Sequence, residues 1–124
     1  MKREAALDTI LSTYLQEKKF YCYYELKQVA IDSFSFGKIR KVQWEGLQAT
    51  EKHGLNWKMS DEISRPKPLD GFNTPPLPSY LVIFFKDEFV FVRFWKIVEL
   101  RERGVISISR SMAEEISDKI IKLK

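Results

Sequence analysis

The chain has 124 residues, 44% of them hydrophobic, and a net charge of +4, which suits one compact domain, residues 1–124, and is too short for two. No apolar run approaches the roughly 18 residues of a membrane helix, and the first residues lack the apolar region of a secretory signal. We therefore expect an intracellular, cytoplasmic protein with no membrane segment. The single cysteine, Cys22, excludes an intrachain disulfide and is expected to be a small, buried hydrophobic residue.

The first expected helix covers residues 3–17, because apolar side chains from Leu7 to Leu15 fall on one stripe of a helical period. The segment DTILSTYL is also rich in β-branched residues, which leaves a strand open as the alternative. Residues 20–27 alternate in character and are expected to form a strand. One face of that strand carries Phe20, Cys22, Tyr24 and Leu26, and the other carries Tyr21, Tyr23, Glu25 and Lys27.

A turn at DSFSFG precedes a second helix, which we expect over residues 38–52 with Gly54 placed to end it. In this phase Ile39, Val42 and Leu47 lie on the inner side of the helix, and Gln43 lies on its solvent side. Two tryptophans in this part of the sequence have two possible roles, since such rings either stack on exposed bases or fill a core. They are Trp44 and Trp57.

A long loop is expected over residues 55–79, which contain all five prolines and almost no periodicity. The apolar segments 80–85 and 89–94 flank the charged turn KDE, and this pattern predicts a hairpin at the centre of a sheet. A short strand is expected within GVISIS, residues 104–109.

The last expected element is a C-terminal helix. Ser111 and Glu114 have the spacing of a capping box that opens it, and Met112, Ile116 and Ile120 would lie on its inner face. Helices and strands in this order predict an α+β domain.

The excess positive charge lies in residues 18–58, which carry eight Lys and Arg residues against four Asp and Glu residues. Such an excess favours a polyanionic partner, and it is also compatible with an ordinary solvated face. The candidate nucleic-acid-binding residues are Lys18, Lys19, Lys38, Arg40 and Lys41.

Glu25 and Lys27 are two residues apart on the predicted strand, so they project from the same face about 6.5 to 7 Å apart. A carboxylate at this spacing can hold Mg²⁺ on a phosphate, and the ammonium can orient the attacking water and offset charge on the phosphorane. This division of labour is typical of phosphodiester hydrolysis. The alternative is a solvated ion pair at the end of a strand.

The segments YELK, SFSFGKIRKVQWEGL, YLVIFF and GVISIS together resemble the core of Holliday junction resolvases of the archaeal Hjc and bacterial RecU types. These enzymes belong to the PD-(D/E)xK nuclease superfamily. The E-x-K strand corresponds to Glu25 and Lys27, the phenylalanine-rich turn to Phe34 and Phe36, and the glutamine of the following helix to Gln43.

The resemblance implies a restriction-endonuclease-like fold, a mixed β-sheet flanked by helices. It also implies a DNA endonuclease, dependent on Mg²⁺ or Mn²⁺, that acts as a homodimer on branched DNA in the cytoplasm, at a nucleoid or on viral DNA. Glu25 would be a metal ligand, Lys27 would assist the water, and Gln43 would position water or phosphate.

A second acidic metal ligand is expected in this family, usually an aspartate on the strand before E-x-K. Asp8 is the best candidate here, and Glu4 is the alternative if the first helix supplies the ligand. An incomplete acidic set would instead leave a nuclease-fold module that binds DNA without cutting it. A third possibility is a protein interaction module that acts through the loop at 55–79, which is longer than the family's usual connection.

Overall fold

The computed structural model describes residues 4–53, 56–58, 71–73 and 77–123, and the side chains within them except those of residues 50–76. The elements are α1 (Glu4–Glu17), β1 (Tyr23–Val29), β2 (Ser33–Ser35), the 3₁₀ turn η1 (Phe36–Lys38), α2 (Lys41–His53), β3 (Asn56–Lys58), β4 (Gly71–Asn73), β5 (Ser79–Phe85), β6 (Glu88–Arg93), α3 (Phe94–Glu102), β7 (Ser107–Ser109), α4 (Arg110–Ile116) and β8 (Lys119–Lys122).

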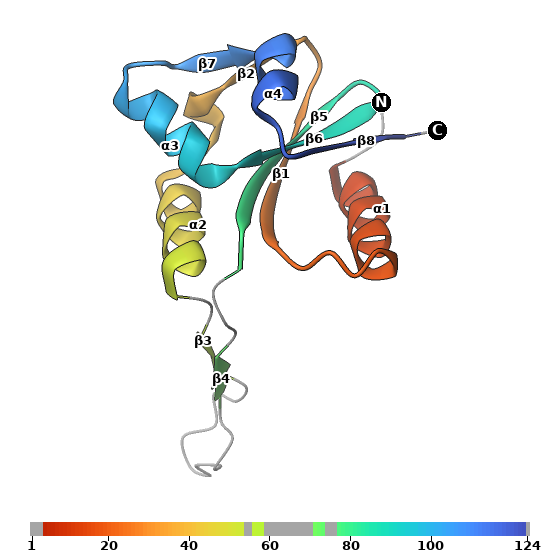
Figure 1. Ribbon diagram of the computed structural model, residues 1–124, viewed down its shortest axis with the longest axis vertical. Helices are drawn as coiled ribbons and strands as arrows, with labels where there is room; N and C mark the ends of the chain where they lie inside the picture. Colours follow the sequence, from red (N-terminus) through yellow and green to blue (C-terminus); the bar gives the residue numbers. More distant parts are fainter. Residues whose placement is uncertain (1–3, 54–55, 59–70, 74–76, 124) are drawn as a thin grey trace.

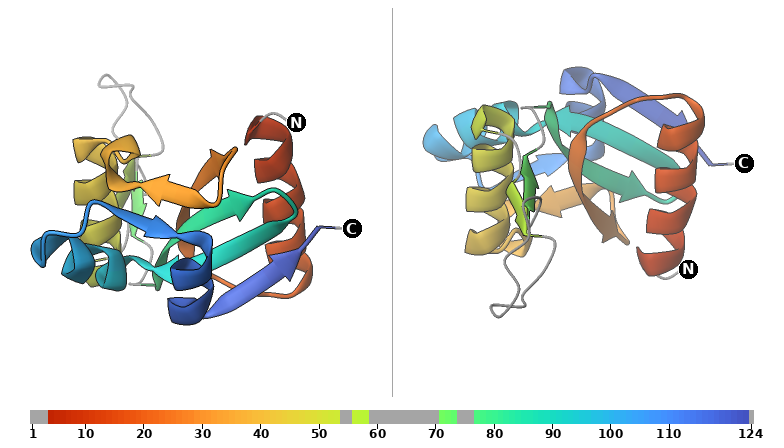
Figure 2. Two further views of the ribbon diagram at one scale, coloured as in Figure 1. Left: turned by 90° about the horizontal axis from the view of Figure 1, so that it is seen from above. Right: turned by 90° about the horizontal axis from the view of Figure 1, so that it is seen from below.

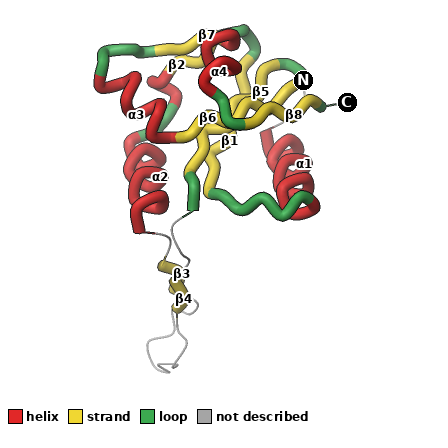
Figure 3. Tube along the Cα trace, in the orientation of Figure 1, coloured by secondary structure: helices red, strands yellow, loops and turns green. Residues whose placement is uncertain are grey.

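The main sheet has four strands in the order β1-β5-β6-β8 (Figure 1; Figure 3). β1 runs parallel to β5, and the β5–β6 and β6–β8 pairs are antiparallel. β5 is buried along its whole length, which explains its nearly continuous apolar sequence. The predicted α+β class, with a mixed sheet flanked by helices, is confirmed. None of the helices in the described part of the chain is long and apolar enough to cross a membrane.

A separate hydrophobic cluster lies on each face of the sheet. On one face, α1 buries Leu7, Leu11 and Leu15 against alternate residues of β1, β5 and β6. On the other face, α2, α3 and α4 enclose a second cluster together with the two-stranded β2–β7 ladder. Figure 2 shows α1 on one side of the sheet and α2 and α3 on the other. Successive side chains of β1 therefore alternate between the face covered by α1 and the face covered by α2.

Several predicted elements are confirmed. The first helix, the E-x-K strand and the central β5–β6 hairpin form within a few residues of their expected bounds. In residues 55–79, β3 and β4 form a short antiparallel ladder that the sequence did not indicate, and most of this segment lies outside the described residues. Cys22, predicted to be buried, is only half-buried beside the core, and this partial burial raises the pKa of its thiol to about 11.

The turn at DSFSFG was predicted incompletely, because Ser33–Ser35 form β2 and pair with β7. The 3₁₀ turn that follows delays the start of α2 to Lys41, so Ile39 lies outside the helix and is not part of its inner face. Val42, predicted to face inward, is 75% exposed, and Trp44 occupies the core instead. The side chain of Trp57 lies outside the described residues.

The C-terminal prediction was wrong in two respects. The hydroxyl of Ser109 caps α4 by accepting a hydrogen bond from the backbone N of Met112 at 3.2 Å, so Ser111 is not the cap. The helix ends at Ile116, and the expected inner-face residue Ile120 is 39% exposed on β8. Pairing with the open edge of β6 satisfies the backbone of residues 119–122, which explains why a strand replaces the helix there.

A charged network ties α4 to the β5–β6 turn. The side chain of Glu88 is 2% exposed, and its Oε1 accepts a hydrogen bond from Nε of Arg110 at 3.0 Å. Arg110 also donates to Asp87 at 3.0 Å and lies 3.6 Å from Asp32 and 3.9 Å from Glu114. One guanidinium therefore faces four carboxylates that come from three separate parts of the chain.

The network predicts a pH-dependent stability. A side-chain hydrogen bond to Glu88, burial and the charge of Glu88 raise the pKa of Glu114 above its usual value, and Arg110 and Lys122 oppose this. The raised pKa means that folding favours protonated Glu114, so this stabilisation is present below the usual Glu pKa of about 4.3 and is lost as pH rises. Glu114→Gln keeps the hydrogen bond without ionising, so we expect its stability relative to wild type to increase with pH.

Urea unfolding at a series of pH values measures this difference. Glu115→Gln, the same substitution at an exposed position of α4, is the matched control. A Glu114→Gln variant whose difference from wild type does not change with pH would contradict the raised pKa of Glu114.

Candidate functional site

Glu25 and Lys27 project from the same face of β1, as the sequence predicts. In the parallel ladder they are paired with Leu81 and Ile83 of β5. Lys27 Nζ lies 3.6 Å from Glu25 Oε1, and the two side chains are 17% and 29% exposed, respectively. The pair is thus half-buried at an edge strand of the sheet, where its charges are less screened than those of a solvated pair.

Gln43, in the first turn of α2, completes this group. Its Oε1 accepts a hydrogen bond from the backbone N of Arg40 at 3.0 Å, and its Nε2 donates to Glu25 Oε1 at 2.5 Å. The prediction that Gln43 lies on the solvent side of its helix was therefore wrong, because α2 packs against β1 and β5 and directs this side chain to the strand. Since the carbonyl is held at the helix start, the amide must point toward the carboxylate.

Asp8 approaches from the other side of β1. It lies on α1, and its Oδ1 accepts a hydrogen bond from the Tyr24 hydroxyl at 2.8 Å. Burial, followed by this hydrogen bond, raises the pKa of Tyr24, so the phenol remains a donor. Tyr24 and Glu25 are neighbours on a strand and point to opposite faces. Because β1 is an edge strand, Asp8 and Glu25 nevertheless line one open pocket of about 350 Å³.

The same pocket is lined by Glu4, so its three carboxylates supply the hard oxygen donors that Mg²⁺ prefers. Within the described residues, no three His, Cys, Asp or Glu side chains are close enough to form a ready metal cluster. Proteins commonly hold Mg²⁺ through one or two carboxylates, with water and substrate phosphates completing the shell. The donor chemistry of Glu25 together with Asp8 fits such a site.

The five candidate nucleic-acid-binding residues form two groups rather than one. Lys18 and Lys19 follow α1, whereas Lys38, Arg40 and Lys41 surround the start of α2, on the other side of the sheet (Figure 1). The second group is the one connected to Glu25, because the backbone of Arg40 holds Gln43.

Two residues near these groups were missed from the sequence. Lys119 places its Nζ over the rings of Tyr14 and Phe20, beside Lys18, and Tyr24 holds Asp8. Lys119 was assigned to a helix, so its position beside α1 was not foreseen. The alternation of β1 did place Tyr24 on the face opposite Glu25, which was a signal for its role.

Comparisons with protein-family models, with curated proteins and with solved structures find no match to this chain. What the site does is therefore inferred from the geometry and chemistry of its own residues.

Proposed function

We propose that this domain is a metal-dependent DNA endonuclease, similar to Holliday junction resolvases, that hydrolyses phosphodiester bonds in branched DNA. The observation that carries the proposal is the contact of Glu25 with both Lys27 and Gln43, at 3.6 and 2.5 Å, on the edge of the sheet. An E-x-K pair alone is common in protein sequences. Here the pair is half-buried, and a glutamine on the neighbouring helix orients its carboxylate, which is the kind of support that a preorganised active site needs.

Each residue has a chemical role in this proposal. Glu25, with Asp8, would hold Mg²⁺ or Mn²⁺, which when bound acidifies a water molecule and offsets the charge of the phosphate. The Lys27 ammonium lies beside Glu25, where it orients the attacking water and stabilises negative charge on the phosphorane. Gln43 fixes the orientation of Glu25 through its two hydrogen bonds and is therefore a positioning residue.

The DNA would lie along the start of α2 in this proposal. Lys38, Arg40 and Lys41 are exposed there, and phosphate contacts from such residues fix the position of a strand without reading its sequence. A homodimer would present two equivalent sites, as the symmetric cutting of two strands of a four-way junction requires.

A second candidate is a nuclease-fold module that binds branched DNA without cutting it. The observation that favours it is the placement of Asp8, whose carboxylate is engaged by Tyr24 at 2.8 Å on the α1 face of the strand. If Asp8 keeps this partner when DNA is bound, Glu25 is left with fewer acidic neighbours than cleavage requires.

Incubation of the protein with four-way junction, flapped, single-stranded and duplex DNA, with Mg²⁺ or Mn²⁺, separates these candidates. We expect the branched substrates to be bound and cut, and a chelator to remove cleavage but not binding. Binding without cleavage of any substrate would refute the endonuclease and leave the second candidate. A protein that binds none of these DNAs at low salt would refute both.

A further inference from the structure

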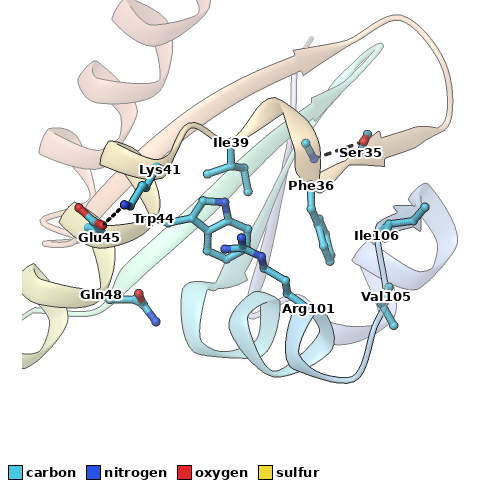
Figure 4. Close-up of a pocket in the computed structure, with 11 residues that line it drawn as sticks. Ser35, Phe36, Ile39, Lys41, Trp44, Glu45, Gln48, Arg101, Val105 and Ile106 are labelled. Carbon is cyan, nitrogen blue, oxygen red and sulfur yellow. Dashed lines mark hydrogen bonds and ion pairs between the residues drawn. The ribbon is translucent and has the colours of Figure 1, made fainter.

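A second hollow lies between α2 and α3, closed at one end by the 3₁₀ turn (Figure 4). It is open to solvent and has a volume of about 610 Å³. Its apolar walls are Phe36, Ile39, Trp44, Val105 and Ile106. The helix positions that line it are nearly opposite Gln43 on α2, so it is separate from the Glu25 site.

Arg101 of α3 lines this hollow together with the charged residues Lys41 and Glu45. Its guanidinium lies 4.4 Å from the centroid of the Trp44 ring, which is itself only 6% exposed and packs against Phe36 and Phe94. The guanidinium lies over the indole ring, and Arg101 is exposed, so the side of the guanidinium away from the ring is accessible to a ligand. A buried ring thus holds an exposed cation in a fixed orientation.

The neighbouring cations, unlike Arg101, form ion pairs with carboxylates. Arg103, the residue that follows α3, is paired with Glu99 at 2.6 Å, and Lys41 of α2 with Glu45 at 3.8 Å. Across the described residues, Arg101 has no such ion pair, and its contact is the aromatic ring. Arg101 is therefore oriented without being neutralised, as a residue that receives a ligand would be.

We propose that this hollow binds one unpaired nucleotide of the branched DNA, with its base stacked on the open face of Arg101. The proposal rests on the proposed function, since it assigns part of the same DNA substrate. Pockets for small ligands have volumes of about 300–1,000 Å³, with mainly apolar walls and a few polar groups, as here. Guanidinium planes and aromatic rings are the usual platforms for splayed bases.

The rim of the hollow matches the remaining parts of a nucleotide. Ile106 is 78% exposed beside Val105 and would cover the base from the side. The Lys41–Glu45 ion pair, at 3.8 Å, also lines the hollow, and Lys41 would exchange Glu45 for a phosphate when the strand binds. The first turn of α2 carries Lys41 toward this hollow and Gln43 toward Glu25. A strand that follows this turn would reach the reactive site and deliver an unpaired base to Arg101.

Flapped DNA with 2-aminopurine at the unpaired position beside the branch tests the proposal. The fluorescence of this base reports its stacking, and anisotropy of the same DNA gives the affinity. We expect wild-type protein to change the 2-aminopurine signal, and Arg101→Ala to remove that change and weaken flap binding by about tenfold. Arg101→Lys keeps the charge without the plane, so it should also lose the signal. Arg103→Ala removes the same charge from the residue just beyond the same helix and should lower affinity by no more than about twofold.

Equal effects of Arg101→Ala and Arg103→Ala, or a wild-type signal in Arg101→Lys, would overturn the stacking platform. An equal loss of affinity for flapped and fully duplex DNA would also overturn it, because Arg101 would then contact phosphate alone. Melting temperatures show whether the variants fold.

The endonuclease proposal and the nucleotide-binding proposal can be refuted independently of each other. Wild-type protein that gives the Arg101-dependent signal without cutting loses only the endonuclease, and protein that cuts without the signal loses only this inference.

Discussion

Glu25→Gln is expected to lower the rate of Mg²⁺-dependent cleavage of branched DNA by at least about a hundredfold, a rise in the activation barrier on the order of 3 kcal/mol. Glutamine has the shape of glutamate and can still accept the Gln43 hydrogen bond through its carbonyl, but it lacks the charge that holds a metal. The side chain lies at the sheet edge, so no core cavity forms. DNA affinity and stability should therefore remain close to wild type.

Single-turnover cleavage of a labelled junction, with anisotropy and melting on the same samples, measures these quantities. Glu115→Gln, on the exposed surface of α4, removes the same charge as a matched control and should cut normally. Lys27→Met should show a loss like that of Glu25→Gln, since Lys27 acts on the same water. A Glu25→Gln protein that cuts at the wild-type rate would show that the reaction takes place elsewhere or not through this carboxylate.

The same prediction extends to Asp8, the second proposed metal ligand. We expect Asp8→Asn to lose cleavage to the same extent as Glu25→Gln, because both carboxylates line one pocket. The asparagine still accepts the Tyr24 hydroxyl through its carbonyl oxygen, so α1 remains docked. Full activity in Asp8→Asn would exclude Asp8 as a ligand and leave Glu4 as the other carboxylate of the pocket.

The strands of the main hairpin were predictable because burial on both faces favours a continuous apolar run, which β5 and β6 have except at Ser79, Glu88 and Arg93 at their ends. Among the elements whose side chains the structure describes, no other has that pattern. β8 was not predictable in this way. Its sequence, KIIK, does not alternate between polar and apolar residues, and the nearby Ser111 and Glu114 suggested a helix. Only the open edge of β6 decides between the two. α3 was missed because Phe94 continues the apolar run of β6, although the strand ends at Arg93.

The site was predictable to the extent that it is local. Glu25 and Lys27 share a face because they are two residues apart on a strand, whatever the rest of the chain does. The contact of Gln43 with Glu25 spans 18 residues and depends on where α2 begins, which the 3₁₀ turn determines. The division of the basic residues into two groups depends on which side of the sheet each helix covers, and charge counted along the sequence carries no such information.

The largest effect on stability is expected from Arg110→Met, which should lower the free energy of unfolding by about 3–5 kcal/mol. Glu88 is 2% exposed, and its Oε1 is held by Arg110 Nε at 3.0 Å. Removing the guanidinium leaves this carboxylate buried without its cation, and Asp87, Asp32 and Glu114 then add repulsion instead of sharing a partner. Methionine keeps the apolar stem, so the loss reports charge and hydrogen bonding rather than packing.

Urea unfolding of a double-mutant cycle isolates the pair. Once Glu88→Gln has removed the buried charge, we expect Arg110→Met to cost about 2 kcal/mol less than it does in wild type, because the remaining amide does not require a cation. Arg103→Met, which breaks the exposed pair with Glu99, should cost less than about 1 kcal/mol. If Arg110→Met is as mild as Arg103→Met, Glu88 must be neutral or hydrated in the folded protein. The stability of α4 would then come from the burial of Ala113 and the Ser109 cap instead.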